Sequence, residues 1–324
     1  MGGAVLSASI GLLGLVATTA MAALAQSFES RIIRIVVPAA SSTPPDIVSR
    51  IIANELSSRE GWRVIVENRS SGGGIVAGND VLQQPADGTS ILAMFLPNVA
   101  APALMKVPYR LDTDFAPVIK VSVSYNALVV NPSFPVHSVA ELITLLKGQP
   151  DRFNFSSGGY GTPAHLIGEL FKLQAGVRAT HVPYQQFPQA IGDLLNGTNH
   201  YMFITMLPVI DLVNAGRLRA LAATGPRRVL VLKDIPTMVE AGFPQLVVED
   251  WVGFGVKSGT PAQTVARLNQ AINKALASPT VRESFARIGA EPAGGTSAEF
   301  GELVKSQLAY WQTVVTEAGI KILP

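Results

Sequence analysis

Short apolar segments alternate with longer segments of helical periodicity along most of this chain. "RIIRIVV" (31–37) has the length and the β-branched content of a buried strand, and "PPDIVSRIIANELSS" (44–58) repeats apolar residues at helical spacing. Further strands are predicted at 63–68, 91–95, 126–132, 153–157, 180–184, 201–204, 218–224 and 251–256. Strands that alternate with helices in this way are typical of an α/β protein with largely parallel sheets.

The domain organisation follows from the lack of any linker. No short repeat, low-complexity tract or Pro/Ser-rich segment interrupts the chain, which favours two α/β lobes joined by continuous strands. We expect the crossings near 121–125 and 249–253. The predicted parts are an export signal (1–25), the first part of lobe 1 (26–124), lobe 2 (125–250) and a return segment with C-terminal helices, mainly in lobe 1 (251–324).

The N-terminal segment predicts export to the periplasm. Its first 25 residues carry no charge, and an apolar stretch leads to Ala23-Leu24-Ala25, a small-x-small pattern expected at a signal-peptidase site. The alternative is a membrane anchor, since about twenty apolar residues can span a bilayer. The absence of cysteine excludes disulfides and thiolate chemistry, and a net charge of +2 gives no case for nucleic acid.

The stretch "SSGGYGTPAHL" (156–166) concentrates glycine and hydroxyl residues between a strand and a helix. It lacks the Lys of a P-loop and the spacing of a dinucleotide-binding turn. The chain has no G-x-S-x-G elbow, although Ser156 or Ser157 could meet His165 or His181 in a hydrolase. His165 and Glu169 share a helix face, but two ligands do not make a metal site.

The remaining interpretation is a cradle for an anion. Thr162 and Pro163 suit the cap and the first position of a helix, so free N–H groups and the helix dipole would attract a carboxylate. The first lobe has a matching "SSTPPD" (41–46) after its first strand. Because ligands in open α/β sheets bind beyond the carboxyl ends of strands, the two loops predict lobes that close on an anionic small molecule.

Several segments in their order and spacing resemble the Bug-type receptors of tripartite tricarboxylate transporters. They include "VIVENRSSGGGIVAGNDV", "FNFSSGGYGTPAHLIGELFK" and "ATHVPYQQFPQAIGDLLNG". The resemblance implies a two-lobed periplasmic-binding-protein (Venus flytrap, type II-like) fold with a ligand cleft between the lobes. It also implies a monomeric, non-catalytic receptor without cofactor or metal, which presents a small-molecule carboxylate to membrane permease subunits.

The resemblance also implies the residues of the ligand site. The family holds a carboxylate between the two loops, and the matching positions here, with neighbouring candidates, are Ser41, Ser42, Thr43, Asp46, Asn98, Ser156, Ser157, Gly161, Thr162, His165, Tyr184, Gln185 and Thr205. Serines stand where the family's first loop usually has paired glycines, Gln185-Gln186 replace a common Lys-Gly, and Ile204-Thr205 replace a frequent Asp. The ligand of this chain therefore cannot be inferred from the ligand of a relative.

The ligand class is predicted from aromatic residues near the expected cleft. Phe95, Tyr160, Tyr184, Phe187 and Trp251 could line a flat slot, although each could equally be core or lobe surface. This ranks aromatic mono- or dicarboxylates shaped like terephthalate above aliphatic di- and tricarboxylates. The alternative functions are an exported serine hydrolase and a sensor that docks on a signalling partner.

Overall fold

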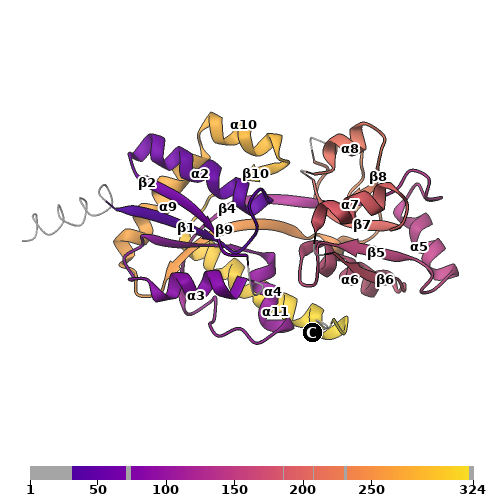
Figure 1. Cartoon of the computed structure of the whole chain (residues 1–324), viewed down its shortest axis with the longest axis horizontal. Coiled ribbons are helices and arrows are strands. Elements are labelled where there is room, and N and C mark those ends of the chain that lie inside the picture. The colour runs from indigo at the N-terminus through magenta and orange to yellow at the C-terminus, as the bar shows by residue number, and fades with distance from the viewer. Residues whose placement is uncertain (1–30, 71–73, 185, 207, 230–231, 321–324) are drawn as a thin grey trace, which may run out of the picture.

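The computed structural model describes residues 31–70, 74–184, 186–206, 208–229 and 232–320 (Figure 1). The predicted export signal lies outside these ranges. Within them, no helix combines the length and the apolar character needed to cross a bilayer. The described chain forms two lobes built around a ten-stranded sheet, with strand order β2-β1-β3-β9-β4-β7-β5-β6 and with β8 and β10 pairing to β4.

Lobe 1 is built from strands that each lead into a helix. The strands are β1 (Ile32–Val37), β2 (Arg63–Asn68) and β3 (Ser90–Phe95), and the helices are α2 (Pro44–Glu60), α3 (Ile75–Gln83) and α4 (Leu96–Leu104). β1 lies between β2 and β3 and is parallel to both. Its side chains are almost all β-branched and largely buried, which is why this segment forms a central strand. The helices therefore begin at one common edge of the sheet.

Lobe 2 repeats this arrangement. Its strands are β5 (Asn154–Ser157), β6 (Thr180–Pro183), β7 (Tyr201–Thr205) and β8 (Arg219–Ala223), and its helices are α5 (Val139–Gly148), α6 (Pro163–Ala175), α7 (Phe187–Leu195) and α8 (Ile210–Asn214). β5 is parallel to β6 and β7. The helices α6, α7 and α8 follow the carboxyl ends of these three strands, as α2, α3 and α4 do in lobe 1.

Two long strands connect the lobes. β4 (Phe115–Val130) pairs with β9 (Glu249–Lys257) in lobe 1 and continues into lobe 2, where it pairs with β7 and β8. Figure 1 shows both strands crossing between the two halves of the molecule. The predicted boundaries after 124 and 250 fall within β4 and β9, so each lobe boundary would lie inside a continuous strand.

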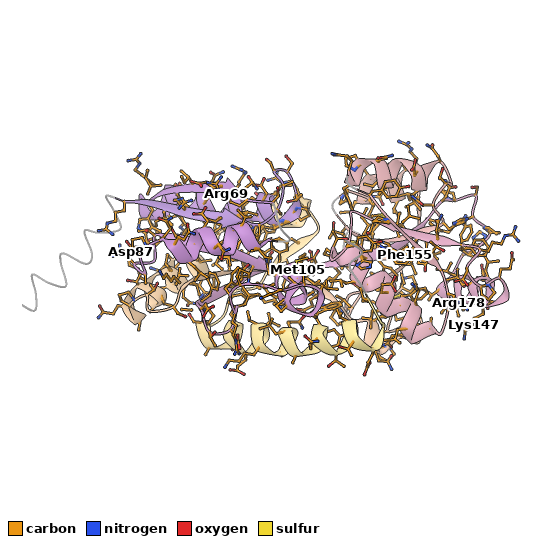
Figure 2. The ribbon with its side chains drawn as sticks, turned by 60° about the horizontal axis from the view of Figure 1, so that its bottom comes forward. Arg69, Asp87, Met105, Lys147, Phe155 and Arg178 are labelled. Atoms are coloured by element: carbon orange, nitrogen blue, oxygen red, sulfur yellow. The ribbon has the colours of Figure 1, made fainter. Side chains whose placement is uncertain are left out.

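The C-terminal segment covers both faces of the sheet. It contains α9 (Ala262–Leu276), α10 (Pro279–Arg287), β10 (Ala290–Pro292) and α11 (Ser297–Glu317), after a short 3-10 helix at Pro244–Leu246. The helices α9 and α10 pack beside α2 on one face, and α11 packs against α4 on the other. Figure 2 shows α11, in yellow, running beneath both lobes. Its buried Phe300 packs edge-on against Trp251 of β9, with ring centroids 5.7 Å apart. The core is therefore continuous on this side of the connection between the lobes.

Candidate functional site

The loop between β1 and α2 ends in a distinctive hydrogen-bond pattern. Thr43 is the residue before the first turn of α2, but its hydroxyl does not cap the helix and instead donates to the carbonyl of Ala40 (2.7 Å). Ser42 has a left-handed backbone (φ 65°), and its N–H donates to the Asp46 carboxylate (2.9 Å). Asp46 therefore holds the loop in place from the first turn of the helix.

The loop between β5 and α6 has the same pattern in lobe 2. Thr162 precedes the first turn of α6, and its hydroxyl also turns back, to the carbonyl of Gly159 (2.7 Å). Gly161 has a left-handed backbone (φ 76°), and its N–H donates to Nδ1 of His165 (3.1 Å). The expectation that Thr162 caps α6 with its side chain is wrong, because that hydroxyl is already bonded within the loop.

The shared pattern leaves the helix N-termini available. The first N–H groups of any helix have no partner within it, and they carry the positive end of the helix dipole. In both loops the threonine hydroxyl bonds elsewhere, and the side chain of the third helical residue takes an N–H from outside the helix. Pro44, Pro45 and Pro163 have no N–H, so the first-turn donors that could face an anion are the N–H groups of Asp46 in α2 and of Ala164 and His165 in α6.

Asp46 is a buried carboxylate whose charge is compensated by neighbouring hydrogen-bond donors. Only 2% of its surface is exposed. It accepts hydrogen bonds from Arg50 Nε (3.0 Å) and from Asn68 Nδ2 (2.9 Å) besides the Ser42 N–H. Burial alone would raise the pKa of Asp46, but these hydrogen bonds outweigh it and hold the pKa below its usual value. Asp46, the side chain that braces the lobe 1 loop by accepting the Ser42 N–H, is thus ionised but paired.

The corresponding brace in lobe 2 is an uncharged imidazole. The ring of His165 stacks on that of His181 with centroids 4.2 Å apart, and His181 Nε2 lies 2.7 Å from Ser157 Oγ. Burial, with a smaller effect of the Lys172 charge, lowers the pKa of His165 to about 4. Burial and the neighbouring His165 lower the pKa of His181 to about 3. Both rings are therefore neutral at pH 7, and His165 carries its proton on Nε2.

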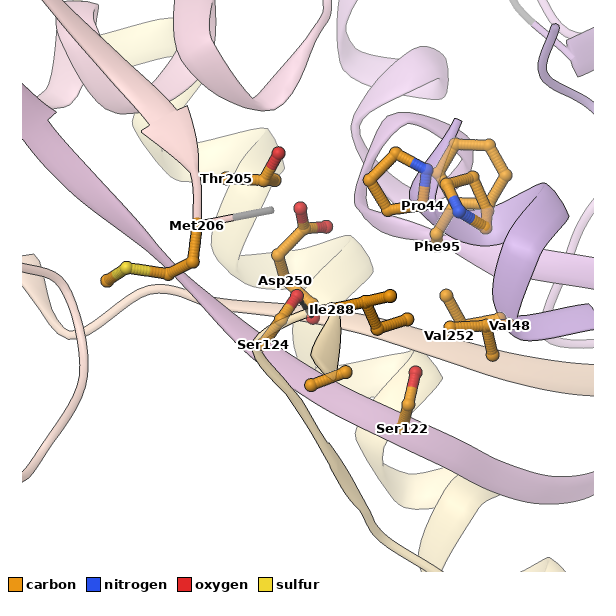
Figure 3. Close-up of a pocket in the computed structure, with 12 residues that line it drawn as sticks. Pro44, Val48, Phe95, Ser122, Ser124, Thr205, Met206, Asp250, Val252 and Ile288 are labelled. Atoms are coloured by element: carbon orange, nitrogen blue, oxygen red, sulfur yellow. Dashed lines mark hydrogen bonds between the residues drawn. The ribbon is translucent and has the colours of Figure 1, made fainter. Parts of the chain in front are cut away.

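A pocket lies between the lobes at the start of α2 (Figure 3). It is lined by α2, by the crossing strands, by the end of β7 and by the turn before β10: Pro44, Pro45, Val48, Phe95, Ser122, Ser124, Thr205, Met206, Asp250, Val252, Ile288 and Ala290. The cavity has a volume of about 20 Å³, which is room for about one water molecule. The pocket is too narrow here for a larger solute.

Comparison with known proteins identifies the family. A family model described as the tripartite tricarboxylate transporter family receptor matches residues 48–320. The chain belongs to this receptor family. It is 32% identical to Protein BugT of Bordetella pertussis, over 92% of both chains. Rhodopseudomonas palustris Rpa4515, solved with adipate, is 34% identical (TM-score 0.81; 91% of this chain, 99% of that one), and MatC with bound malate, from the same organism, is 29% identical (0.79; 88% and 99%).

The family and the fold confirm the predicted class of protein. The receptor is a periplasmic solute-binding protein and not an enzyme, and its two-lobed α/β fold is that of these relatives. Ser157 does meet His181, as the hydrolase alternative required. However, Ser157 is fully buried, and His181 Nδ1 has no partner among the described residues, so no carboxylate orients the ring. The pair stabilises the loop instead.

Within the described residues, the histidines are not part of a metal site. Glu169, the other residue of the predicted helix-face pair, is bonded to Lys172 (2.8 Å). Across the part of the chain that the structure describes, no group of three or more His, Cys, Asp or Glu side chains could hold a metal ion.

The other candidate residues lie in several surroundings. Asn98 is buried and accepts the Phe95 N–H at the start of α4 (3.0 Å). The Tyr184 hydroxyl donates to Asp193 (2.6 Å) and accepts from Asn199 (2.8 Å). Ser41 and Ser42 are exposed and Thr205 lines the pocket, whereas Ser156 is buried and its hydroxyl has no partner in the described structure; Gln185 lies outside the described residues.

The expected aromatic slot is not assembled as a unit. Phe95 is the one of its members that lines the pocket. Tyr160 packs edge-on against His165 and His181, and Phe187 lies against Gly158. Tyr184 is bonded within lobe 2, as described above. Trp251 is fully buried in the core and not at the cleft edge, which confirms for this residue the core alternative.

Asp250 of β9 is the pocket residue that sequence reasoning missed. Its side chain extends into the middle of the pocket, between Thr205 and the side of Ile288 (Figure 3). Its carboxylate has no hydrogen-bond or ion-pair partner among the described residues, and burial raises its pKa to about 7. In the sequence it is one acidic residue within a strand, and only the pairing of β9 with β4 brings it between the lobes.

Proposed function

We propose that this receptor captures a small carboxylate between its two lobes and delivers it to the membrane subunits of a tripartite tricarboxylate transporter. The observation that carries the proposal is the pair of matched loops, each at the carboxyl end of a strand and at the N-terminus of a helix. One such helix end is common in proteins. Two of the same construction, one in each lobe, favour a ligand held by both.

A carboxylate suits these loops chemically. Each of its oxygens accepts two or more hydrogen bonds, and charge-assisted bonds from N–H and O–H groups are strong. We propose that Ser41, Ser42 and Thr43 of lobe 1 and Gly161 and Thr162 of lobe 2 contact the ligand. Asp46, Asn98, Ser156, Ser157, His165 and Tyr184 would act mainly by holding these segments, and Gln185 and Thr205 would border the ligand.

Capture requires the lobes to move apart. With room for about one water molecule, the pocket has to open before a dicarboxylate can enter. β4 and β9 are the continuous connections about which the lobes would rotate. A ligand that contacts both lobes shifts the population to the closed state by its difference in affinity for the two states. Small-angle scattering should therefore show a smaller radius of gyration with ligand, and tight binding without compaction would contradict a hinge.

The carbon frame of the ligand could be aliphatic or aromatic. The relatives solved with adipate and with malate favour aliphatic dicarboxylates. Phe95 in the pocket favours aromatic acids of the size and shape of terephthalate. Both classes share the carboxylate that the loops would bind, so one experiment can include both.

A thermal-shift screen tests the proposal. The panel contains adipate, succinate, malate, citrate, benzoate and terephthalate, with neutral amides of the same frames as controls. A ligand at a hundred times its Kd stabilises the folded state by about 2.7 kcal/mol. We expect at least one acid, and no amide, to raise Tm. Ser42→Ala should reduce the shift, whereas Ser306→Ala, at an exposed position on α11, should not. No response to any acid would contradict a carboxylate receptor.

A further inference from the structure

Asp250 is the only ionisable side chain among the described residues that line the pocket between the lobes. The other lining residues are proline, aliphatic, aromatic, Met, Ser or Thr. Three of these are hydroxyl residues, Ser122, Ser124 and Thr205, but none of them bonds to the Asp250 carboxylate in the described structure. Ser124 donates instead to the main-chain carbonyl of Asp250 (3.0 Å).

The neighbouring Glu249 is, by contrast, a carboxylate with a partner in the structure. Glu249 is one position away on β9 and forms an ion pair with Lys120 of β4 (2.6 Å). Among the residues that the structure describes, Asp250 has neither a cation nor a hydrogen-bond donor, although it is partly buried. An unsatisfied acceptor in a partly dry pocket lowers stability, and it is expected where a ligand supplies the missing donor.

The pocket also places Asp250 within reach of a ligand held by the loops. Pro44 and Pro45 begin α2 directly after Thr43, and they line the same pocket as Asp250. A solute whose carboxylate is bound at the N-terminus of α2 would therefore extend its other end toward the hinge. A second carboxylate there would meet the negative charge of Asp250, whereas a hydroxyl or an ammonium group would be bonded by it.

We propose that Asp250 accepts a hydrogen bond from the bound solute, so that the receptor selects carboxylates bearing a hydroxyl or ammonium group over their unsubstituted counterparts. The inference rests on the proposed carboxylate function and adds a requirement to it. The aliphatic or aromatic frame of the ligand is independent of this requirement. Burial, which raises the pKa of Asp250 to about 7, is consistent with a carboxylate whose charge lacks a partner until the ligand arrives.

Matched ligand pairs test the proposal by isothermal titration calorimetry at pH 8. Malate and aspartate are compared with succinate, and 4-hydroxybenzoate is compared with benzoate. In the wild-type protein the substituted acid of at least one pair should bind about ten- to a hundredfold more tightly, the range expected for a hydrogen bond to a charged group. Asp250→Asn should remove most of this preference. It should also tighten succinate binding, because the like charge is gone.

The control is Asp234→Asn, which makes the same charge change at an exposed position outside the pocket. It should leave every affinity unchanged. A purely structural role of Asp250 would weaken all ligands together, and that result would overturn the proposal. Equal binding within every pair would overturn it while leaving the carboxylate receptor intact, and a lack of binding by all of these acids would refute both.

Discussion

The loop before α2 is braced by a carboxylate, Asp46, and the loop before α6 by an imidazole, His165. Both accept the N–H of the residue that precedes the N-cap, and both of those residues are left-handed. Asp46 is ionised but paired with Arg50, and His165 is neutral because it is buried. Neither brace adds an unpaired negative charge near the helix N-terminus. The comparison indicates that an acceptor is needed at this position, and that either a carboxylate or an imidazole can supply it.

Removing the charged brace should have the largest effect. Asp46→Ala leaves the Ser42 N–H without its acceptor and deprives Arg50 and Asn68 of theirs. Breaking a buried, hydrogen-bonded carboxylate cluster typically costs about 3–5 kcal/mol. Because Arg50 is half exposed and can be rehydrated, we expect the lower part of that range in urea unfolding, with a loss of carboxylate binding.

Asp46→Asn separates the acceptor from the charge. The amide oxygen can still accept the Ser42 N–H, so the loop should keep its shape while the pairing with Arg50 weakens. We expect less than half of the stability loss of Asp46→Ala, together with measurable ligand binding. If Asp46→Asn is as damaging as Asp46→Ala, the charge matters more than the position of the acceptor, and the comparison between the loops fails.

Acid should distinguish the two loops. The pKa of His165 and that of His181 are about 4 and about 3, both below the usual value of 6.5. The unfolded chain therefore binds these protons first as pH falls, and their contribution to stability is lost between about pH 6.5 and pH 3. Each proton is worth about 1.4 kcal/mol per pH unit. The contribution of Asp46, whose pKa is lowered, is lost only below the usual Asp range.

The measurement is the difference in unfolding free energy between wild type and a His165→Asn, His181→Asn double variant, from pH 7 to pH 4. The wild-type protein should lose more stability with acid than the variant does. Asp250 works in the opposite direction, because its raised pKa favours the folded state as pH falls, but it is common to both proteins. His137→Asn, at an exposed position, is the control. Parallel pH profiles would show that the buried pair does not titrate with unfolding.

The sequence predicted the architecture well because each element carries its own signal. The β-branched run at 31–37 and the helical spacing after Pro44 determine β1 and α2 locally. The loops that end in Thr-Pro can also be recognised from the order of their residues. The direction of a threonine hydroxyl is not visible in the same way. Thr43 and Thr162 occupy the N-cap positions, but both bond to the carbonyl three residues earlier, because the left-handed residue before each brings that carbonyl close.

Contacts between distant segments were the part that could not be predicted. Trp251 and Asp250 are adjacent, yet Trp251 packs in the core against α11 and Asp250 faces the pocket. Alternation along a strand places them on opposite faces, but which face borders the cleft depends on the pairing of β9 with β4 and on the position of both lobes. The stacking of His165 on His181 likewise needs the register of β5 and β6.

The smallest expected effect concerns the left-handed residue itself. Gly161 adopts φ 76° without strain, whereas Ser42 adopts φ 65° at a cost of about 1 kcal/mol that glycine would not incur. Gly161→Ala has space for its Cβ, since the nearest atom would be Leu104 Cδ1 at 3.5 Å, so the loss should be the backbone term alone. Ser42→Gly should change stability by less than about 0.5 kcal/mol, because relief of strain offsets the greater freedom of the unfolded chain.

Urea unfolding of both variants, followed by calorimetry with the best ligand of the carboxylate screen, completes the comparison. The Ser42 hydroxyl makes no hydrogen bond within the described structure and is exposed. If it contacts the ligand, Ser42→Gly lowers affinity at unchanged stability, whereas Gly161→Ala lowers both. If Ser42→Gly binds as tightly as wild type, lobe 1 holds the carboxylate through its main chain, as a pair of glycines would, and its serines are replaceable there.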